Sequence, residues 1–510
     1  TGAAARPRAG AGPAGARTVR CAANLEGKPK ILGGLPCAMC GQLADPQTGD
    51  SETTYSNIFY CQGCWQDRKK AQQAARGGAT DEAWNEGSAF VYMKAVEGIQ
   101  AAAGSNGDME TSVAACVGSR PESSAVRGAH GRSLLHHIAE HGDAGAIRKV
   151  LDAYQNFYGR HVELCSTVEM YEDGFGLTAG EIAFAGNHAE AFDALVNSAV
   201  NRPRPSNFCT DSNKAYVKQK LSYEGDGDGA VLKDEKGGGV MMGWEKPLMR
   251  RHAEVIAPTP GLSVMNVGFG LGLIDGFLQE RQPAKHTIVE AHPDVYAEMG
   301  RRGWLDKPGV NVLGPARWQD QIEGMIAAGP FDGIFFDTYA EMYGDLQEFF
   351  KLLPQILKPG GVLSFFNGLS DKNMYAQAIS CRCAQLDLAR LGLACMYEPY
   401  PIGAIDEAEW RKVVNLYWSL ETYYVPVAVR IPENEPDAIT RVFNSLPPRC
   451  DGAQPELRAM AVRPGDACGK VLDDKLAKAR QAAEEARRLE VQQQMIKDAA
   501  TPPLVEAPGA

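Results

Sequence analysis

The chain has 510 residues, and its 52 basic and 63 acidic residues give a formal net charge of −11. This length predicts about two or three domains. The acidic balance excludes a global basic field that would attract nucleic acid, whereas an acidic surface suits cationic, arginine-rich partners. Because no uninterrupted apolar run approaches the roughly 20 residues that a membrane-spanning helix needs, we expect neither nucleic acid nor a membrane as a partner.

The first 30 residues are rich in Ala, Gly, Pro and Arg, and Glu26 is their only acidic residue. This composition is typical of an organelle transit peptide, with Val19-Arg-Cys-Ala-Ala23 in the place of a stromal processing site. A disordered Ala/Gly tail, or translated upstream sequence, fits the same residues equally well. We therefore expect residues 1–30 to be a disordered or transit-like segment, with a chloroplast or another organelle as one candidate compartment.

Two Cys-x-x-Cys pairs follow, Cys37-Ala-Met-Cys40 and Cys61-Gln-Gly-Cys64. Four thiolates can hold tetrahedral zinc, and two such pairs supply them without a large core. Two disulfides are the alternative, which is less favoured because cysteines this close in sequence strain a direct bridge and nothing else indicates secretion. We expect a four-cysteine zinc-knuckle module over residues 31–75 that binds a structural zinc. Residues 76–127, a polar helical pattern with a Gly/Ser-rich stretch, are interpreted as a linker.

Two similar helical units are predicted between residues 128 and 200. In the first, Gly131-Arg-Ser-Leu-Leu-His-His-Ile-Ala-Glu-His-Gly-Asp143 leads into an apolar helix, and the second begins at Gly174. When the two units are aligned, Ala139 corresponds to Ala183. The distance in sequence between these two residues fits one roughly 33-residue ankyrin unit plus an insertion. Fewer than about three such repeats cannot bury a core alone. We therefore expect these ankyrin-like helix pairs to dock on a neighbouring part of the chain.

Three histidines lie in the first unit, His136, His137 and His141. One interpretation makes them ligands. A histidine at this place in an ankyrin-like unit instead caps and packs a turn, and we favour that structural role.

The stretch from Leu262 to Phe277 predicts a buried strand, a glycine-rich turn, Asn266-Val-Gly-Phe-Gly-Leu-Gly272, and the start of a helix. A glycine trio alone is weak evidence for a ligand site. A second apolar run ends at Glu290, and an acidic residue about 20 residues after such a turn binds ribose hydroxyls in nucleotide-binding α/β folds. A third run, Phe331-Asp-Gly-Ile-Phe-Phe-Asp337, also ends in a carboxylate.

Successive apolar runs are separated by lengths that fit helices, so we expect a mostly parallel sheet, covered on both faces, over about residues 240–430. Ligands of such sheets bind at the carboxyl ends of the strands, where Gly268, Glu290 and Asp337 fall. The closing strands lie within Val413 to Val429. There Tyr417, Trp418 and Tyr423 either wall the cleft or, as is commoner for aromatic residues on late strands, belong to the core. Residues 433–510 form a C-terminal extension with a charged, Ala-rich helical pattern.

These motifs, with Leu357-Lys-Pro-Gly-Gly361, resemble the motif series of class I S-adenosylmethionine-dependent methyltransferases. Val240-Met-Met-Gly-Trp-Glu-Lys-Pro-Leu-Met249 and Phe336-Asp-Thr-Tyr339 together resemble guanidinoacetate N-methyltransferase. They resemble more closely the type IV protein arginine methyltransferases, which act on the internal (delta) guanidino nitrogen. The resemblance covers residues 210–432. It implies an α/β fold: a class I Rossmann-like methyltransferase domain, here preceded by ankyrin-like helix pairs and the zinc-knuckle module.

The resemblance also implies roles for individual residues. One departure is Asn266, since many class I methyltransferases have an acidic residue there. The implied substrate-binding residues are Trp244, Glu245, Asp337 and Tyr339. The implied S-adenosyl-L-methionine-binding residues are Tyr216, Met241, Met249, Asn266, Val267, Gly268, Phe269, Gly270, Leu271, Glu290, Ala291, His292, Arg317, Trp318 and Asp337.

Glu245 and Asp337 are the candidate catalytic pair. Pro247 suits the first turn of a helix, so Glu245 sits on the incoming turn, and Asp337 ends a strand. A guanidinium is planar and protonated at ordinary pH, with a pKa of about 12.5 to 13.8. Two carboxylates can hold it bidentately and aim one nitrogen at a methyl donor. Taken separately, Glu245 as a carboxylate answering a helix dipole and Asp337 as a turn cap are the structural alternatives.

The expected function is therefore methyl transfer to the delta nitrogen of arginine in a protein, with the ankyrin-like region as a docking surface for that protein. Family resemblance implies the cytoplasm and nucleus as the compartment. The alternatives are a methyltransferase of a small guanidino compound such as guanidinoacetate, and a non-catalytic ankyrin-type binding scaffold.

Overall fold

The structure is a computed structural model that describes residues 81–105, 107–159, 167–202, 212–368, 370–449 and 451–500, together with six short strands between residues 20 and 60. Those strands pair antiparallel as β1 with β2, β3 with β4 and β5 with β6. The predicted zinc ligands Cys37, Cys40, Cys61 and Cys64 lie outside the described residues. The strand bounds are β1 (Arg20–Ala23), β2 (Pro29–Leu32), β3 (Leu35–Pro36), β4 (Leu43–Ala44), β5 (Asp50–Ser51) and β6 (Phe59–Tyr60).

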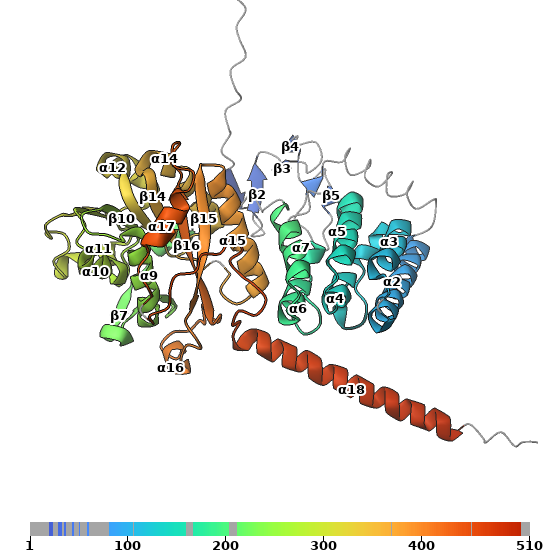
Figure 1. The fold of residues 1–510 in the computed structure, drawn as a ribbon. Coiled ribbons are helices and arrows are strands. Elements are labelled where there is room, and N and C mark those ends of the chain that lie inside the picture. Colours follow the sequence, from blue (N-terminus) through green and yellow to red (C-terminus); the bar gives the residue numbers. More distant parts are fainter. Residues whose placement is uncertain are drawn as a thin grey trace, which may run out of the picture.

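An array of helices precedes the domain that carries the main sheet (Figure 1). It begins with α2 and α3 in the region interpreted as a linker. The region is not a linker but a pair of packed helices. Tyr92, Ala95 and Ile99 recur at helical spacing, and their burial packs α2 against its neighbours. The helices are α2 (Asp81–Ser105), α3 (Met109–Ser119), α4 (Leu134–Ala139), α5 (Ala144–Tyr158), α6 (Ala179–Ala185) and α7 (Ala189–Val200).

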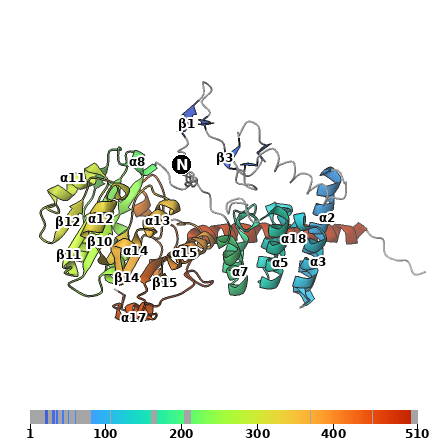
Figure 2. The same ribbon diagram turned by 90° about the horizontal axis from the view of Figure 1, so that it is seen from above.

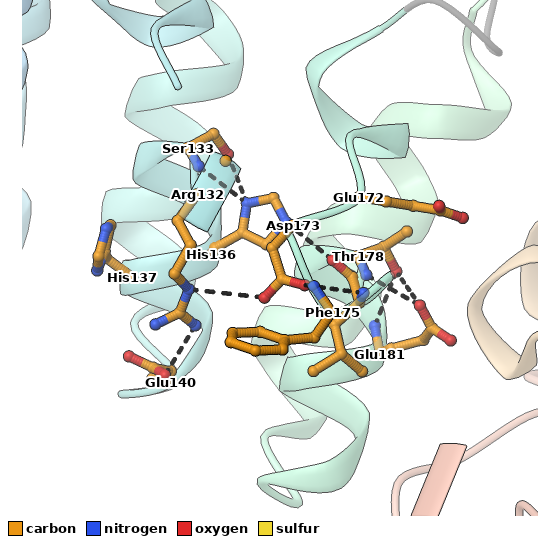
Figure 3. A network of polar contacts seen from close by, with 12 residues as sticks. Arg132, Ser133, His136, His137, Glu140, Glu172, Asp173, Phe175, Thr178 and Glu181 are labelled. Atoms are coloured by element: carbon orange, nitrogen blue, oxygen red, sulfur yellow. Dashed lines mark hydrogen bonds and ion pairs between the residues drawn. The ribbon is translucent and has the colours of Figure 1, made fainter. Parts of the chain in front are cut away.

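A polar network joins the two predicted helical units (Figure 3). The His136 ring is buried, its Nδ1 accepts a hydrogen bond from the Ser133 backbone amide at 3.1 Å, and its Nε2 therefore donates to the Leu177 carbonyl at 3.0 Å. Burial lowers the pKa of His136 to about 4, so the ring is neutral. Thr178 and Glu181 form the matching capping box at the start of α6. His136 thus caps a turn and links the units.

A seven-stranded sheet carries the second half of the chain, in the order β12-β11-β10-β13-β14-β16-β15. The first five of these strands run parallel, and β16 is antiparallel to both its neighbours. This is a Rossmann-like α/β fold, as expected. The bounds are β10 (Ser263–Val267), β11 (Lys285–Val289), β12 (Val310–Leu313), β13 (Phe331–Phe336), β14 (Leu357–Phe365), β15 (Leu393–Pro401) and β16 (Thr422–Arg430).

Strand order reverses between β10 and β13, and the crevice at such a reversal is where open α/β sheets bind ligands. A small antiparallel sheet of β7, β8 and β9 precedes the main one, and helix α9 packs on β13, β14 and β16. These elements are α8 (Ser212–Tyr216), β7 (Ser222–Glu224), β8 (Val231–Lys233), β9 (Gly239–Met242) and α9 (Lys246–Ile256). The remaining helices are α10 (Leu273–Glu280), α11 (Pro293–Arg301), α12 (Ile322–Ala328), α13 (Tyr343–Phe350), α14 (Leu353–Ile356), α15 (Met374–Ala389), α16 (Glu407–Trp410), α17 (Ala438–Ser445) and α18 (Lys470–Ala500). None of the helices in these ranges combines the length and the apolar character that a bilayer crossing requires.

The helical array docks on the sheet domain through α15. The buried ring of Tyr375 packs under Gly180, where a Cβ atom would lie 2.2 Å from the ring, and its hydroxyl donates to the Leu195 carbonyl at 3.2 Å. Helix α18 runs along the array (Figures 1 and 2), and its Lys475 ammonium pairs with Glu181 at 2.9 Å. The array therefore packs on the sheet domain through α15, and α18 adds an ion pair to α6.

Replacing Tyr375 with Ala should destabilise the protein by about 3–5 kcal/mol, because the deleted ring leaves a cavity between α15 and α6. Denaturant unfolding measures this loss. The control is Phe90→Ala, which truncates a side chain that is 64% exposed and should change stability by less than about 0.5 kcal/mol. Equal losses in the two variants would contradict a docking role for Tyr375.

Candidate active site

A cavity of about 340 Å³ opens at the carboxyl ends of β10, β11, β13 and β14. Segments far apart in the sequence meet there, from α8 to the connection between β15 and β16. Its walls carry five carboxylates and one arginine, Arg317, which pairs with Asp320 at 3.1 Å. The acidic residues of the wall are Glu245, Glu290, Asp337, Glu341 and Asp371.

The glycine turn after β10 forms one wall and fixes a neighbouring strand end. Gly268 has φ +100°, and a Cβ atom there would lie 1.8 Å from the carbonyl oxygen of Asp337. Only glycine permits both the conformation and the approach. The Asn266 side chain lies behind the turn, where its Nδ2 donates to the Gly268 carbonyl at 2.8 Å and to Asp275 at 2.9 Å. Asn266 therefore supports the turn from the side away from the cavity wall.

Glu290 lies at the end of β11 and is held by backbone amides. Its Oε2 accepts from the Phe269 amide at 2.8 Å, and its Oε1 accepts from the His292 amide at 2.6 Å. Burial raises the pKa of this carboxyl, and these amide donors lower it. A carboxylate fixed in this way beside the glycine turn has the chemistry to accept hydrogen bonds from a ribose diol.

Glu245 reaches the cavity from the turn between β9 and α9. Its Oε1 accepts two hydrogen bonds, from the Met242 amide at 2.9 Å and from the Tyr417 hydroxyl at 2.6 Å. Pro247 stands in the first turn of α9, where its missing N–H costs nothing. The turn therefore points Glu245 into the cavity, although the residue itself is only 3% exposed.

Glu245 and Asp337 both line this cavity, and no basic side chain among the described residues acts on the charge of either. Burial, and secondly the charge of Asp337, raise the pKa of Glu245 to about 8, against the lowering effect of its Tyr417 and Met242 donors. Burial also raises the pKa of Asp337 to about 7. Two desolvated acids without a cation, the buried Glu245 and the half-buried Asp337, are a costly arrangement that binding of a cation would relieve.

The far end of the cavity is lined by aromatic rings. Trp318 Nε1 donates to both carboxylate oxygens of Glu341 at 3.0 Å, which fixes the indole. The Tyr216 ring packs on Tyr339, with centroids 4.8 Å apart, and the Asn213 amide nitrogen donates to the Tyr339 carbonyl at 2.8 Å. Planar walls of this kind suit a flat heterocycle.

Most of the residues proposed from the sequence meet at this cavity. Those in its wall are Tyr216, Met241, Glu245, Val267, Gly268, Phe269, Gly270, Glu290, Ala291, Arg317, Trp318, Asp337 and Tyr339. Those outside the wall are Met249, Asn266, Leu271, His292 and Trp244.

Sequence reasoning missed five polar residues of the wall: Asn213, Thr338, Glu341, Asp371 and Asn415. Asn213 lies on the short helix α8, Thr338 directly follows Asp337, and the other three lie in connections. Except for Thr338 no motif marks them, so the fold brings them to the site. Tyr417, left open between wall and core, lines the cavity, whereas Trp418 and Tyr423 are buried outside it.

Residues 210–381 match the family model described as guanidinoacetate N-methyltransferase. Curated relatives named protein arginine N-methyltransferase 2 include that of Aspergillus oryzae, 40% identical over 42% of this chain and 51% of the relative. That of Saccharomyces cerevisiae is 36% identical over 45% and 58%, and that of Eremothecium gossypii is 33% identical over 58% and 70%. The chain spans about half the length of the first of these relatives. Spermidine synthase from Thermotoga maritima is a structural neighbour at 16% identity and TM-score 0.31, over 45% of this chain and 73% of that chain, a likeness too weak to add to the fold described above.

The raised pKa of Glu245 predicts a pH-dependent stability. A carboxyl whose pKa rises from 4.5 to about 8 on folding lets the folded protein bind more protons than the unfolded chain between those values, so stability falls as the pH rises through that window. Glu245→Gln removes the buried charge. The ligand-free variant should therefore exceed the wild type in unfolding free energy near pH 8 by on the order of 2–4 kcal/mol and match it near pH 4.

Denaturant unfolding at the two pH values measures this difference. A variant that is less stable than the wild type near pH 8 would show that the Glu245 carboxylate is needed to hold the fold.

Proposed function

The chain belongs to the protein arginine N-methyltransferase 2 family, and we propose that it transfers a methyl group from S-adenosyl-L-methionine to the delta nitrogen of arginine residues in proteins. The observation that carries this proposal is that two carboxylates, the buried Glu245 and the half-buried Asp337, line one cavity with the glycine turn. A bound cation would offset both negative charges at once and keep both acids ionised.

The guanidinium of arginine fits that requirement. It is planar, carries its donors in a fixed fork and stays protonated, so each carboxylate can accept from one side of it. Its charge would lower the pKa of Glu245 and Asp337 again, and both acids would then be ionised in the substrate complex. Held in this way, the guanidinium presents one nitrogen in a fixed direction, and the carboxylates stabilise positive charge until a proton leaves.

The remaining walls fit the cofactor. When bound, S-adenosyl-L-methionine supplies an electrophilic methyl group on its sulfonium. We propose that Glu290 holds the ribose, that Trp318 and Arg317 flank the adenine, and that the Gly268 turn accommodates the methionine part. Asn213 supports this fit, because its buried Oδ1 has no hydrogen-bond partner among the described residues and can accept from a polar group of a bound ligand.

The N-terminal modules support a protein as the substrate. We propose that the helix pairs of residues 128–200 are ankyrin-like, since His136 and Glu181 occupy equivalent capping positions in them. A firmly docked array of this kind offers a docking surface that a small metabolite does not need. The cytoplasm and nucleus are the compartments we propose for this reaction.

We also propose that Cys37, Cys40, Cys61 and Cys64 bind a structural zinc. Metal analysis of the full chain should find about one zinc per chain in the wild type and a clear loss in Cys37→Ser. Equal zinc content in the two proteins would remove this proposal.

A methyltransferase of a small guanidino compound is the second candidate, favoured by the family match over residues 210–381. Incubation with cofactor labelled in its methyl group, together with either a protein extract or guanidinoacetate, separates the two. We expect label in protein, at a delta nitrogen of arginine. Label in guanidinoacetate alone would contradict the protein-arginine proposal.

In the same assay Glu245→Gln should lower transfer by about 100-fold or more while cofactor affinity changes little, because the carboxylate contacts the guanidinium and not the cofactor. The matched control is Glu280→Gln, an exposed carboxylate on α10 that pairs with Arg250. It should transfer at the wild-type rate. Label in neither substrate, despite measurable cofactor binding, would favour a binding scaffold.

A further inference from the structure

Tyr417 lies between the cavity and a cluster of aromatic rings. It belongs to the connection between β15 and β16, and its hydroxyl stands 2.6 Å from Glu245 Oε1 and 3.1 Å from Trp244 Nε1. An indole nitrogen can only donate, so the tyrosine oxygen accepts from Trp244. The tyrosine proton is then free for one acceptor, the Glu245 carboxylate.

The Glu245 carboxylate is therefore held through one oxygen only. Oε1 accepts from the Met242 amide at 2.9 Å and from Tyr417. Oε2 accepts no hydrogen bond within the described parts of the chain, and it is not among the fully buried polar atoms that lack a partner. Two donors on the same oxygen prevent the carboxylate from turning over, so Oε2 is the oxygen presented to the cavity.

Tyr417 itself has little freedom to move. Its ring packs against Trp244 and Trp410, with centroids 5.8 and 5.3 Å away. Two residues earlier, Asn415 accepts from the Gly239 amide at 3.1 Å, and a Cβ atom at Gly239 would lie 2.9 Å from the Tyr417 ring. The connection is thereby fastened to strand β9, which leads directly into the turn that carries Glu245.

We propose that Tyr417 is a positioning residue, whose hydroxyl, oriented by Trp244, fixes the Glu245 carboxylate so that Oε2 meets the guanidinium of the substrate. This role rests on the proposed arginine methylation. A hydrogen bond donated to the ionised form of an acid also favours that form. Tyr417 therefore keeps Glu245 ionised at lower pH than its buried position alone would allow.

The test is Tyr417→Phe, which removes the hydroxyl and keeps the ring. The acidic limb of the pH profile of kcat/KM should move to higher pH by about one unit, and kcat/KM near neutral pH should fall by about 10- to 100-fold. Cofactor affinity should stay within about twofold of the wild type, because Tyr417 acts on the substrate side.

The matched control is Tyr424→Phe. Tyr424 lies on β16, is buried, and donates to the carboxylate of Asp466 at 2.7 Å, away from the cavity wall. The Tyr424→Phe variant loses a tyrosine–carboxylate hydrogen bond, as Tyr417→Phe does, so the two variants should lose similar stability. The pH profile of kcat/KM of Tyr424→Phe should nevertheless overlay that of the wild type. A Tyr417→Phe profile that also overlays the wild type, or a shift of equal size in the control, would overturn the proposal.

A second measurement does not depend on activity. In protein labelled with ¹³C at glutamate carboxyls, the Glu245 resonance, identified by its loss in Glu245→Gln, should titrate at higher pH in Tyr417→Phe than in the wild type. An unchanged titration would overturn the positioning role. A shifted titration in a protein that methylates no arginine would keep the positioning role and reject the proposed function instead.

Discussion

The desolvation of two acids at one cavity, the buried Glu245 and the half-buried Asp337, is the constraint on which the proposed active site depends. Glu245 and Asp337 come from distant segments, and burial raises the pKa of both. Such an arrangement costs folding free energy in the ligand-free protein, so surrounding elements must enforce it. A tight turn before α9 and two donors hold Glu245. The close approach of Gly268 to the Asp337 carbonyl holds the end of β13 against the turn after β10. The proposed substrate is the group that would relieve this cost.

The parts of the site that local sequence could predict are those that sit on regular elements. The glycine turn and Glu290 follow apolar runs whose spacing predicts parallel strands, and the strand order brings their carboxyl ends together. A residue's place within a motif does not show which way its side chain points. Met249 and Asn266 fall in matching motifs, yet their side chains face the core and the back of the turn, because helix phase and turn geometry decide which neighbours reach the cavity.

Other parts depend on contacts between distant segments, which periodicity cannot show. Asn213 lies on the short helix α8, and Asp371 and Asn415 lie in connections, so packing sets the place of all three. The sequences of α2 and α3 are rich in small and polar residues, which favours the interpretation as a linker. These helices form a packed pair because they are buried against α4 and α5. The docking of the helix pairs on another part of the chain agrees with the expectation from the sequence. Tyr375 of α15 makes the contact, and Lys475 of α18 adds an ion pair.

The most direct test of the account is a crystal structure of the protein with S-adenosylhomocysteine and an arginine-containing peptide. We expect the guanidinium between Glu245 and Asp337, with Oε2 of Glu245 as one acceptor and the delta nitrogen facing the cofactor sulfur. A guanidinium bound elsewhere, with the two carboxyls protonated and in contact with each other, would contradict it.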